Sequence, residues 1–224
     1  MSTSLATFDQ DQVGQLEAIV SECNLTALET QGNFQRTFML AEGMKRIRDL
    51  ITPEMMQSIM ALQGSGLGFL TDKDDKGGYP LETVKQITIE AALRGLNMVG
   101  NEVNIIAKRL YATKNGLQRL VREWPGLTNF CLSLGIPEPH QSNCLVEAFA
   151  TWTLNGKAQS LERRGKEAIP VRRNKEMGDD AILGKAKRKM YAAVYEQLTG
   201  MNTDFPEGEV ADALNVSSSP ARIG

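Results

Sequence analysis

Residues 144–172 read CLVEAFATWTLNGKAQSLERRGKEAIPVR, and this stretch decides the fold. Asn155-Gly156 separates two segments that carry β-branched and aromatic residues. Both residues tolerate the positive φ of a type I′ turn, so the pair predicts a β-hairpin. We expect one strand over 144–154, a returning strand over KAQSLERR, and a further short strand over 168–172.

The segments before this hairpin extend the sheet. TNFCLSL, 128–134, predicts a strand, and EVNIIAKRLYA, 102–112, predicts one or two. A turn at 113–116 leads into a short helix, LQRLVREW, which Pro125 ends. We expect His140, within GIPEPHQSN, to lie in a loop.

Helices are predicted on the N-terminal side of these strands. Apolar residues at helical spacing indicate a helix over 10–23 and a second that Asn33 caps. Thr52-Pro53-Glu54 is a helix start signal, because a capping hydroxyl precedes a proline and an acid in the first turn. A glycine-rich break over 63–80 separates this helix from one over 81–95.

A last long helix begins at Gly178-Asp179-Asp180 and ends near Leu198, with Gly200 placed to terminate it. Ile182, Ala186, Met190 and Val194 form an apolar arc on it. We expect the opposite side to project three cations into solvent, Lys185, Arg188 and Lys189. Lys187 lies at the border between the two sides.

Helices, then strands, then a helix predict an α+β fold: an antiparallel sheet or hairpin core with flanking helices and a long basic C-terminal helix. We divide the chain into an N-terminal helical or flexible segment (1–33), a core (34–200) and an acidic, serine-rich mobile tail (201–224).

The charge is unevenly distributed. The formal net charge is -2, but residues 105–190 have a balance of about +8 and the rest about -10. Such asymmetry is typical of a polyanion-binding surface flanked by acidic ends. No apolar run is long enough for a membrane span, and the polar start MSTSLATFDQDQ does not resemble a signal peptide. We therefore expect the protein to stay in the cytoplasm of the cell that makes it.

The sequence lacks the motifs for P-loop ATP binding and for a zinc site, and its one calcium-like loop is incomplete. The chain has no G-x-x-x-x-G-K-[ST], and its single histidine and three widely spaced cysteines offer no zinc site. Asp72, Asp74 and Asp75 begin like a calcium loop, but Thr83 stands where a glutamate belongs. We favour a solvated turn there, so we predict no metal site and no catalytic residue. A metal-dependent nuclease using these aspartates is one alternative function, and a structural scaffold with a basic protein-binding face is another.

The cations of the basic segment are the candidate site. Arginine pairs suit bidentate phosphate contacts, and lysines supply less directional charge. Tyr111, Trp152 and Tyr191 are candidate base-stacking surfaces, although Trp152 also fits a core position. The predicted nucleic-acid-binding residues are Lys108, Arg109, Tyr111, Lys114, Arg119, Trp152, Arg163, Arg164, Lys166, Arg172, Arg173, Lys175, Lys185, Lys187, Arg188 and Lys189.

Two stretches resemble the phage RecT/Redβ-type single-strand annealing proteins. One is LETVKQITIEAALRGLNMVGNEVNIIAKRLYATKNGLQRLVRE, with a turn at Leu93-Arg94-Gly95-Leu96-Asn97. The other is IPVRRNKEMGDDAILGKAKRKMYAAVYEQLTG, which is similar to the family's basic helix. The resemblance covers roughly 34–200.

The resemblance implies a protein that binds single-stranded DNA and anneals complementary strands without ATP, as in phage homologous recombination. It implies no enzyme activity and no cofactor. The partners that it implies are single-stranded DNA, the annealed duplex and further copies of the chain in a ring or helical filament. It also suggests contact with a phage exonuclease or a host single-strand-binding protein.

Overall fold

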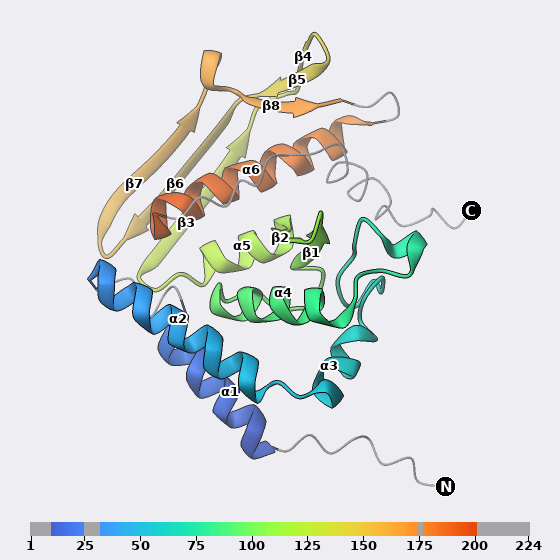
Figure 1. The fold of residues 1–224 in the computed structure, drawn as a ribbon. Coiled ribbons are helices and arrows are strands. Elements are labelled where there is room, and N and C mark those ends of the chain that lie inside the picture. The colour runs from blue at the N-terminus through green and yellow to red at the C-terminus, as the bar shows by residue number, and fades with distance from the viewer. Residues whose placement is uncertain (1–9, 25–31, 174–176, 201–224) are drawn as a thin grey trace, which may run out of the picture. The chain divides into compact units, whose positions relative to one another are not determined.

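The computed structural model describes residues 10–24, 32–173 and 177–200, and these fold as two compact units (Figure 1). The first unit covers residues up to Leu110, and the second begins at Tyr111. Residues of the predicted 34–200 core lie in both units. The predicted tail over 201–224 lies outside the described residues.

The first unit is mainly helical. Its helices are α1 (Gln10–Cys23), α2 (Asn33–Leu50), α3 (Pro53–Met60) and α4 (Leu81–Leu93). Thr52 caps α3, since its hydroxyl accepts a hydrogen bond from the Met55 amide at 3.3 Å. Asn33 is the first helical residue of α2 and Gly32 is the cap, so the prediction that Asn33 caps this helix is wrong. The apolar faces of the four helices form a common core, in which Ile19, Ile47, Met56 and Ile87 are buried.

A β-hairpin spans the boundary between the two units. It pairs β1 (Val103–Ile106) with β2 (Arg109–Ala112), so the segment 102–112 forms two strands, one of the two options that the sequence allowed. Tyr111 and Ala112 of β2 already belong to the second unit. The segment between α4 and β1 bends at Gly95, whose φ of 74° fits the predicted helix stop. The short 3₁₀ turn η1 (Asp74–Lys76) precedes α4.

The elements of the second unit are α5 (Lys114–Arg122), β3 (Leu127–Leu134), β4 (Glu138–His140), β5 (Asn143–Val146), β6 (Ala148–Leu154), β7 (Lys157–Arg163), η2 (Gly165–Glu167), β8 (Ile169–Arg172) and α6 (Asp179–Thr199). Its strands form two three-stranded antiparallel sheets, which follow one another along the same three stretches of chain. Hydrogen bonding joins β3 to β6 and β6 to β7 in one sheet and, beyond an interruption in each stretch, β4 to β5 and β5 to β8 in the other. The interruptions coincide: the Gly135 amide donates to the Glu147 carbonyl at 2.8 Å, and the Gly165 amide donates to the Glu147 carboxylate at 3.1 Å.

Most sequence-based predictions of these elements are confirmed. Asn155 and Gly156 adopt the predicted positive φ values, 49° and 78°, in the hairpin between β6 and β7. Two predictions are wrong. The strand expected over 144–154 is broken at Glu147, because β5 and β6 pair with different partners there. His140 lies in β4, where it pairs with Asn143, instead of in a loop.

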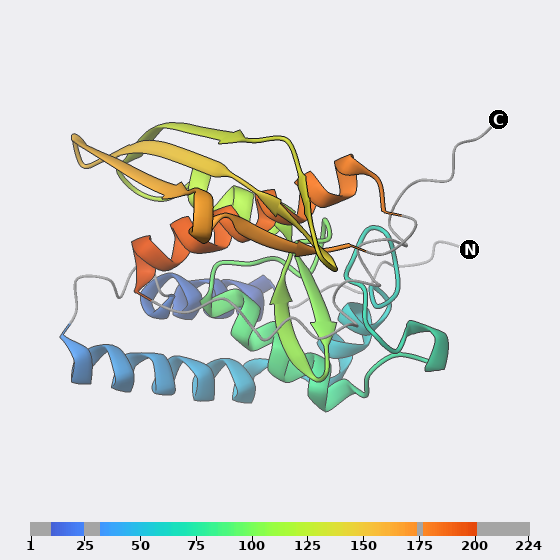
Figure 2. The same cartoon turned by 90° about the horizontal axis from the view of Figure 1, so that it is seen from above.

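Alternation assigns the sheet two different faces. On β6, Ala148, Ala150 and Trp152 are buried, and α6 runs along this side of the strands (Figure 2). The opposite face, called the open face below, carries Phe149 together with small or polar side chains such as Thr151 and Ser133. No element among the described residues of the second unit packs on it. The fold class is therefore α+β, as the sequence predicts, with a long helix covering one face of an antiparallel sheet.

Aromatic contacts fix α6. The Tyr191 ring stacks on Phe130 of β3 with centroids 5.4 Å apart, and Tyr195 meets Trp124 edge-on at 6.0 Å. No helix within the described ranges is long and apolar enough to cross a membrane.

Two glycines test the packing of the first unit. A Cβ at Gly43 would lie 2.7 Å from the Cys23 Cβ, whereas a Cβ at Gly14 would meet nothing within 4 Å. We expect Gly43→Ala to lower the free energy of unfolding by about 1–3 kcal/mol through overpacking. Gly14→Ala should raise it by about 0.5–1 kcal/mol through helix propensity. Urea unfolding followed by circular dichroism measures both, and a neutral Gly43→Ala would contradict the close α1–α2 packing.

Candidate nucleic-acid interface

The predicted cations are distributed over four places in the structure. They lie at the β1–β2 turn, on α5, around the β7–β8 junction and on α6. Lys175 lies outside the described residues. Burial separates these positions into side chains that face solvent and side chains that belong to the core.

The cationic side of α6 is not a solvent-facing stripe, so this prediction is wrong. Arg188 is only 4% exposed, and its Nε donates to the Ala112 carbonyl at 2.9 Å. Its guanidinium lies 3.9 Å from the centroid of the Tyr111 ring, a cation–π contact. Lys185 is buried as well, at 9%. The helical periodicity fails here because α6 packs against α5 and β2 as well as the sheet, so it buries more than one stripe.

The predicted stacking aromatics are also buried. Tyr111 lies under Arg188, Trp152 is 3% exposed on the α6 side of the sheet, and Tyr191 stacks on Phe130. Burial raises the pKa of the Tyr191 hydroxyl, an effect that Arg122 partly opposes. These rings therefore cannot offer faces to nucleobases in this fold, and the alternative of a core Trp152 holds.

Phe149 is the aromatic that the sequence analysis missed. It lies on the open face of β6, half-buried, between Ser133 and Glu162 on the neighbouring strands. The Arg164 guanidinium lies 5.8 Å from its ring centroid. The signal was present in AFATWT, because residues three apart on a strand point to opposite faces. A core Trp152 thus implies a Phe149 that faces away from α6.

Ion pairs hold several of the predicted arginines. Arg164 pairs with Glu162 at 2.7 Å and Arg119 with Glu123 at 2.9 Å, while Arg163 lies 3.9 Å from Glu167. All three carboxylates are half or more exposed. Exposed pairs of this kind contribute about 1 kcal/mol or less. A phosphate can therefore displace the carboxylate from such an arginine at small cost.

The far end of the open face carries a second polar row. Across β4, β5 and β8 the register places His140 beside Asn143 and Asn143 beside Arg172. Arg172 is exposed to solvent. Arg173 and Lys166 are exposed nearby in the chain, and Lys189 of α6 donates to the Pro170 carbonyl at 2.5 Å. Of the remaining predicted cations, Lys114 is exposed at the start of α5 and Lys187 is half-buried.

The β1–β2 turn presents Lys108 and Arg109, both exposed, in the first unit. Ala107 and Lys108 have φ values of 51° and 63°, a left-handed conformation that side chains with a Cβ disfavour. The Asp72 carboxylate accepts from the Ala107 amide at 3.2 Å, and the Tyr79 hydroxyl accepts from the Lys108 amide at 3.1 Å. These contacts hold the strained turn in place.

The Tyr79 hydroxyl also donates to Asp72 at 2.7 Å. These two side chains and their hydrogen bonds to the turn are called the Asp72–Tyr79 clamp below. Burial raises the pKa of Tyr79, and the hydrogen bond to Asp72 raises it further. Because the folded pKa lies above the ordinary value, the protonated tyrosine is the stabilised form. The clamp weakens only as pH rises through that raised value.

The acidic cluster of the nuclease alternative has other partners. Asp72 accepts from the hairpin turn, and Asp74 accepts from the Thr71 hydroxyl at 2.7 Å and amide at 3.0 Å. Within the described ranges, no three Asp, Glu, His or Cys side chains gather in an arrangement that could hold a metal ion. The carboxylates act as caps for this loop.

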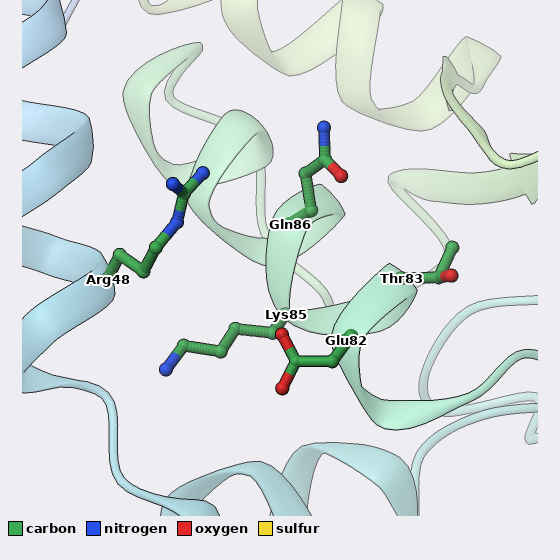
Figure 3. Close-up of a pocket in the computed structure, with 5 residues that line it drawn as sticks. All are labelled: Arg48, Glu82, Thr83, Lys85 and Gln86. Carbon is green, nitrogen blue, oxygen red and sulfur yellow. The ribbon is translucent and has the colours of Figure 1, made fainter.

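A polar depression of about 190 Å³ lies between α2 and α4 in the first unit (Figure 3). Arg48 comes from α2, and the other lining side chains come from α4: Glu82, Thr83, Lys85 and Gln86. The Lys85 ammonium donates to the Ile51 carbonyl at 2.8 Å, where it satisfies the end of α2. None of the predicted site residues that the structure describes lines this depression.

A comparison with protein-family models, with curated proteins and with solved structures found no match to this chain.

Arg188 and Lys187 test the difference between core and surface on α6. We expect Arg188→Ala to lower the free energy of unfolding by about 2–4 kcal/mol, because it removes a buried hydrogen bond and packed carbons. Lys187→Ala should change it by less than about 0.5 kcal/mol. Thermal or urea unfolding measures both, and equal small effects would contradict the core position of Arg188.

The clamp predicts opposite effects of two substitutions. Tyr79→Phe should lower the free energy of unfolding by about 1–2 kcal/mol, since the hydroxyl links Asp72 to the Lys108 amide. Ala107→Gly should raise it by about 1 kcal/mol by relieving the left-handed strain. Urea unfolding checks the signs, and a destabilised Ala107→Gly would contradict the strained turn.

Proposed function

We propose that this protein binds single-stranded DNA on the open face of its second unit and promotes annealing of complementary strands without ATP. The observation that carries the proposal is Phe149, which lies half-buried on the open face with the Arg164 guanidinium over its ring. Sheets that bind single strands use such aromatic side chains as stacking platforms and nearby cations for the backbone.

The surroundings of Phe149 suit an extended strand. Its open-face neighbours are small or polar, including Ser133, Thr151 and Ser160, so they leave room for a base. When a base stacks on the ring, a phosphate can replace Glu162 as the partner of Arg164. Arg172, at the far end of the same face, then supplies a second backbone contact.

Annealing needs little chemistry from the protein. Lysine and arginine side chains neutralise the repulsion between two phosphate backbones, and bases held on an open face remain free to test for pairing. No bond is broken, so no nucleophile, metal or cofactor enters the proposal. The sequence resemblance to RecT/Redβ-type proteins supports it. We include self-association and action in phage-type recombination in the cytoplasm of a bacterial host, alongside an exonuclease or a single-strand-binding protein.

The test is annealing of two complementary fluorescent oligonucleotides without ATP at two salt concentrations, with anisotropy as the measure of binding. We expect faster annealing with intact strands, weakened by salt. Phe149→Ala should weaken binding by about 1–3 kcal/mol, or roughly 5- to 150-fold in Kd. Arg164→Gln should weaken it less and reduce the salt slope by about one.

Two substitutions serve as matched controls. Ser160→Ala changes a small side chain on the open face, and Lys76→Gln removes an exposed cation from η1 in the first unit. Both should leave Kd within about twofold of the original value. Absence of binding even at low salt would contradict the proposal. Equal losses in Lys76→Gln and Arg164→Gln would show that only overall charge matters.

A further inference from the structure

The first unit exposes an aromatic ridge at the start of α2. Phe34 and Phe38 are 81% and 69% exposed, and their rings stack with centroids 6.5 Å apart. Ala41 and Lys45 continue the same helical stripe and are exposed too. Two adjacent exposed phenylalanines are costly to leave in water, so such a patch marks a contact surface.

The same unit contains an apolar groove between α1 and α3. Val13, Met55, Ile59 and Leu62 line about 380 Å³ of it, and among the described residues Ser58 is the one polar side chain in the lining. A smaller apolar cavity of about 160 Å³ continues from Met55 and Ile59 toward α2 and α4. The groove therefore has the size and chemistry to receive aromatic rings.

Ridge and groove lie at opposite ends of the first unit. The Gln12 side chain at the start of α1 donates to the Leu50 carbonyl at the end of α2, and Figure 1 shows the course of these two helices. Because Val13 lines the groove, the groove lies by the C-terminal end of α2. Phe34 and Phe38 occupy the first turns of the same helix, about 20 Å away at 1.5 Å per residue. They cannot reach the groove of their own chain along a continuous helix.

Charge distinguishes the two surfaces. The helices that form the groove, α1 and α3, carry Asp11, Glu17 and Glu54 and no lysine or arginine. Their fourth acid, Glu22, lies at the other end of α1, where it pairs with Arg46 of α2. The helix that bears the ridge carries an excess of cations, and Lys45 ends its exposed stripe. An apolar ridge that ends in a cation thus matches an apolar groove with acidic helices.

We propose that the Phe34–Phe38 ridge of one copy docks into the α1–α3 groove of a second copy. The contact joins two different patches, so it is heterologous: an open filament keeps a free ridge and a free groove at its ends, whereas a closed ring keeps neither. It generates a ring or an open filament. The inference rests on the self-association included in the proposed function, but not on DNA binding.

Complementary variants test this geometry. Phe34→Ser/Phe38→Ser removes the ridge, and Ser58→Arg fills the groove from an exposed position without removing a core side chain. By light scattering coupled to size-exclusion chromatography, we expect the unmodified chain to assemble and each variant alone to be monomeric. An equal mixture of the two variants should form a dimer that does not grow, since only one ridge and one groove remain functional.

Matched controls and DNA binding separate the possible failures. Gln57→Arg adds the same charge to an exposed α3 position outside the groove, and Leu67→Ser removes another exposed apolar side chain, so both should assemble normally. Circular dichroism should show that all variants are folded. Assembly of the two variants at the original size, or a mixture that stays monomeric, would overturn the contact.

A monomeric unmodified chain would also overturn the contact and assign the ridge to another protein or to a segment of the same chain. Assembly through ridge and groove by a chain that binds no oligonucleotide would support the contact while the proposed function fails. If the chain binds oligonucleotides but both variants assemble as before, the proposed function would be supported and the ridge–groove contact overturned.

Discussion

The burial of α6 against one face of the antiparallel sheet is the constraint on which the second unit depends. The helix buries Ala186, Met190 and Val194 against the sheet side and holds β2 through the hydrogen bond from Arg188 to Ala112. A guanidinium taken out of water needs such a partner, and the Tyr111 ring under it supplies further attraction. Removing the arginine would leave the Ala112 carbonyl and the tyrosine ring without this contact.

That constraint also creates the candidate interface. Because α6 covers the Trp152 side, the other face of the same strands is left with Phe149 and small polar residues. The Gly135 and Gly165 amides both donate to Glu147, so the strands are interrupted at the same level. Arg164 lies before this level and Arg172 beyond it, so the candidate interface has a cation on each side of the interruption.

The first unit contributes two different devices. The Asp72–Tyr79 clamp combines a carboxylate that the nuclease alternative assigned to a metal site with the hydroxyl of Tyr79, and both groups hold a strained turn in place. Strain of this kind persists only where surrounding contacts determine it. The exposed ridge at Phe34 and Phe38 is the opposite case, since the described structure offers it no cover and a second chain has a matching groove.

The sequence by itself determined the local elements of this protein. Asn155-Gly156 requires positive φ, Thr52-Pro53 begins a helix, and Gly200 ends one, because these signals act over one turn of chain. The α+β class followed from their order. Only the tertiary structure decided which side chains face solvent. Arg188 reads as surface on a helical wheel but is core, because residues 76 positions earlier pack on it. Phe149 becomes accessible for the same reason: one helix can cover only one face of a sheet.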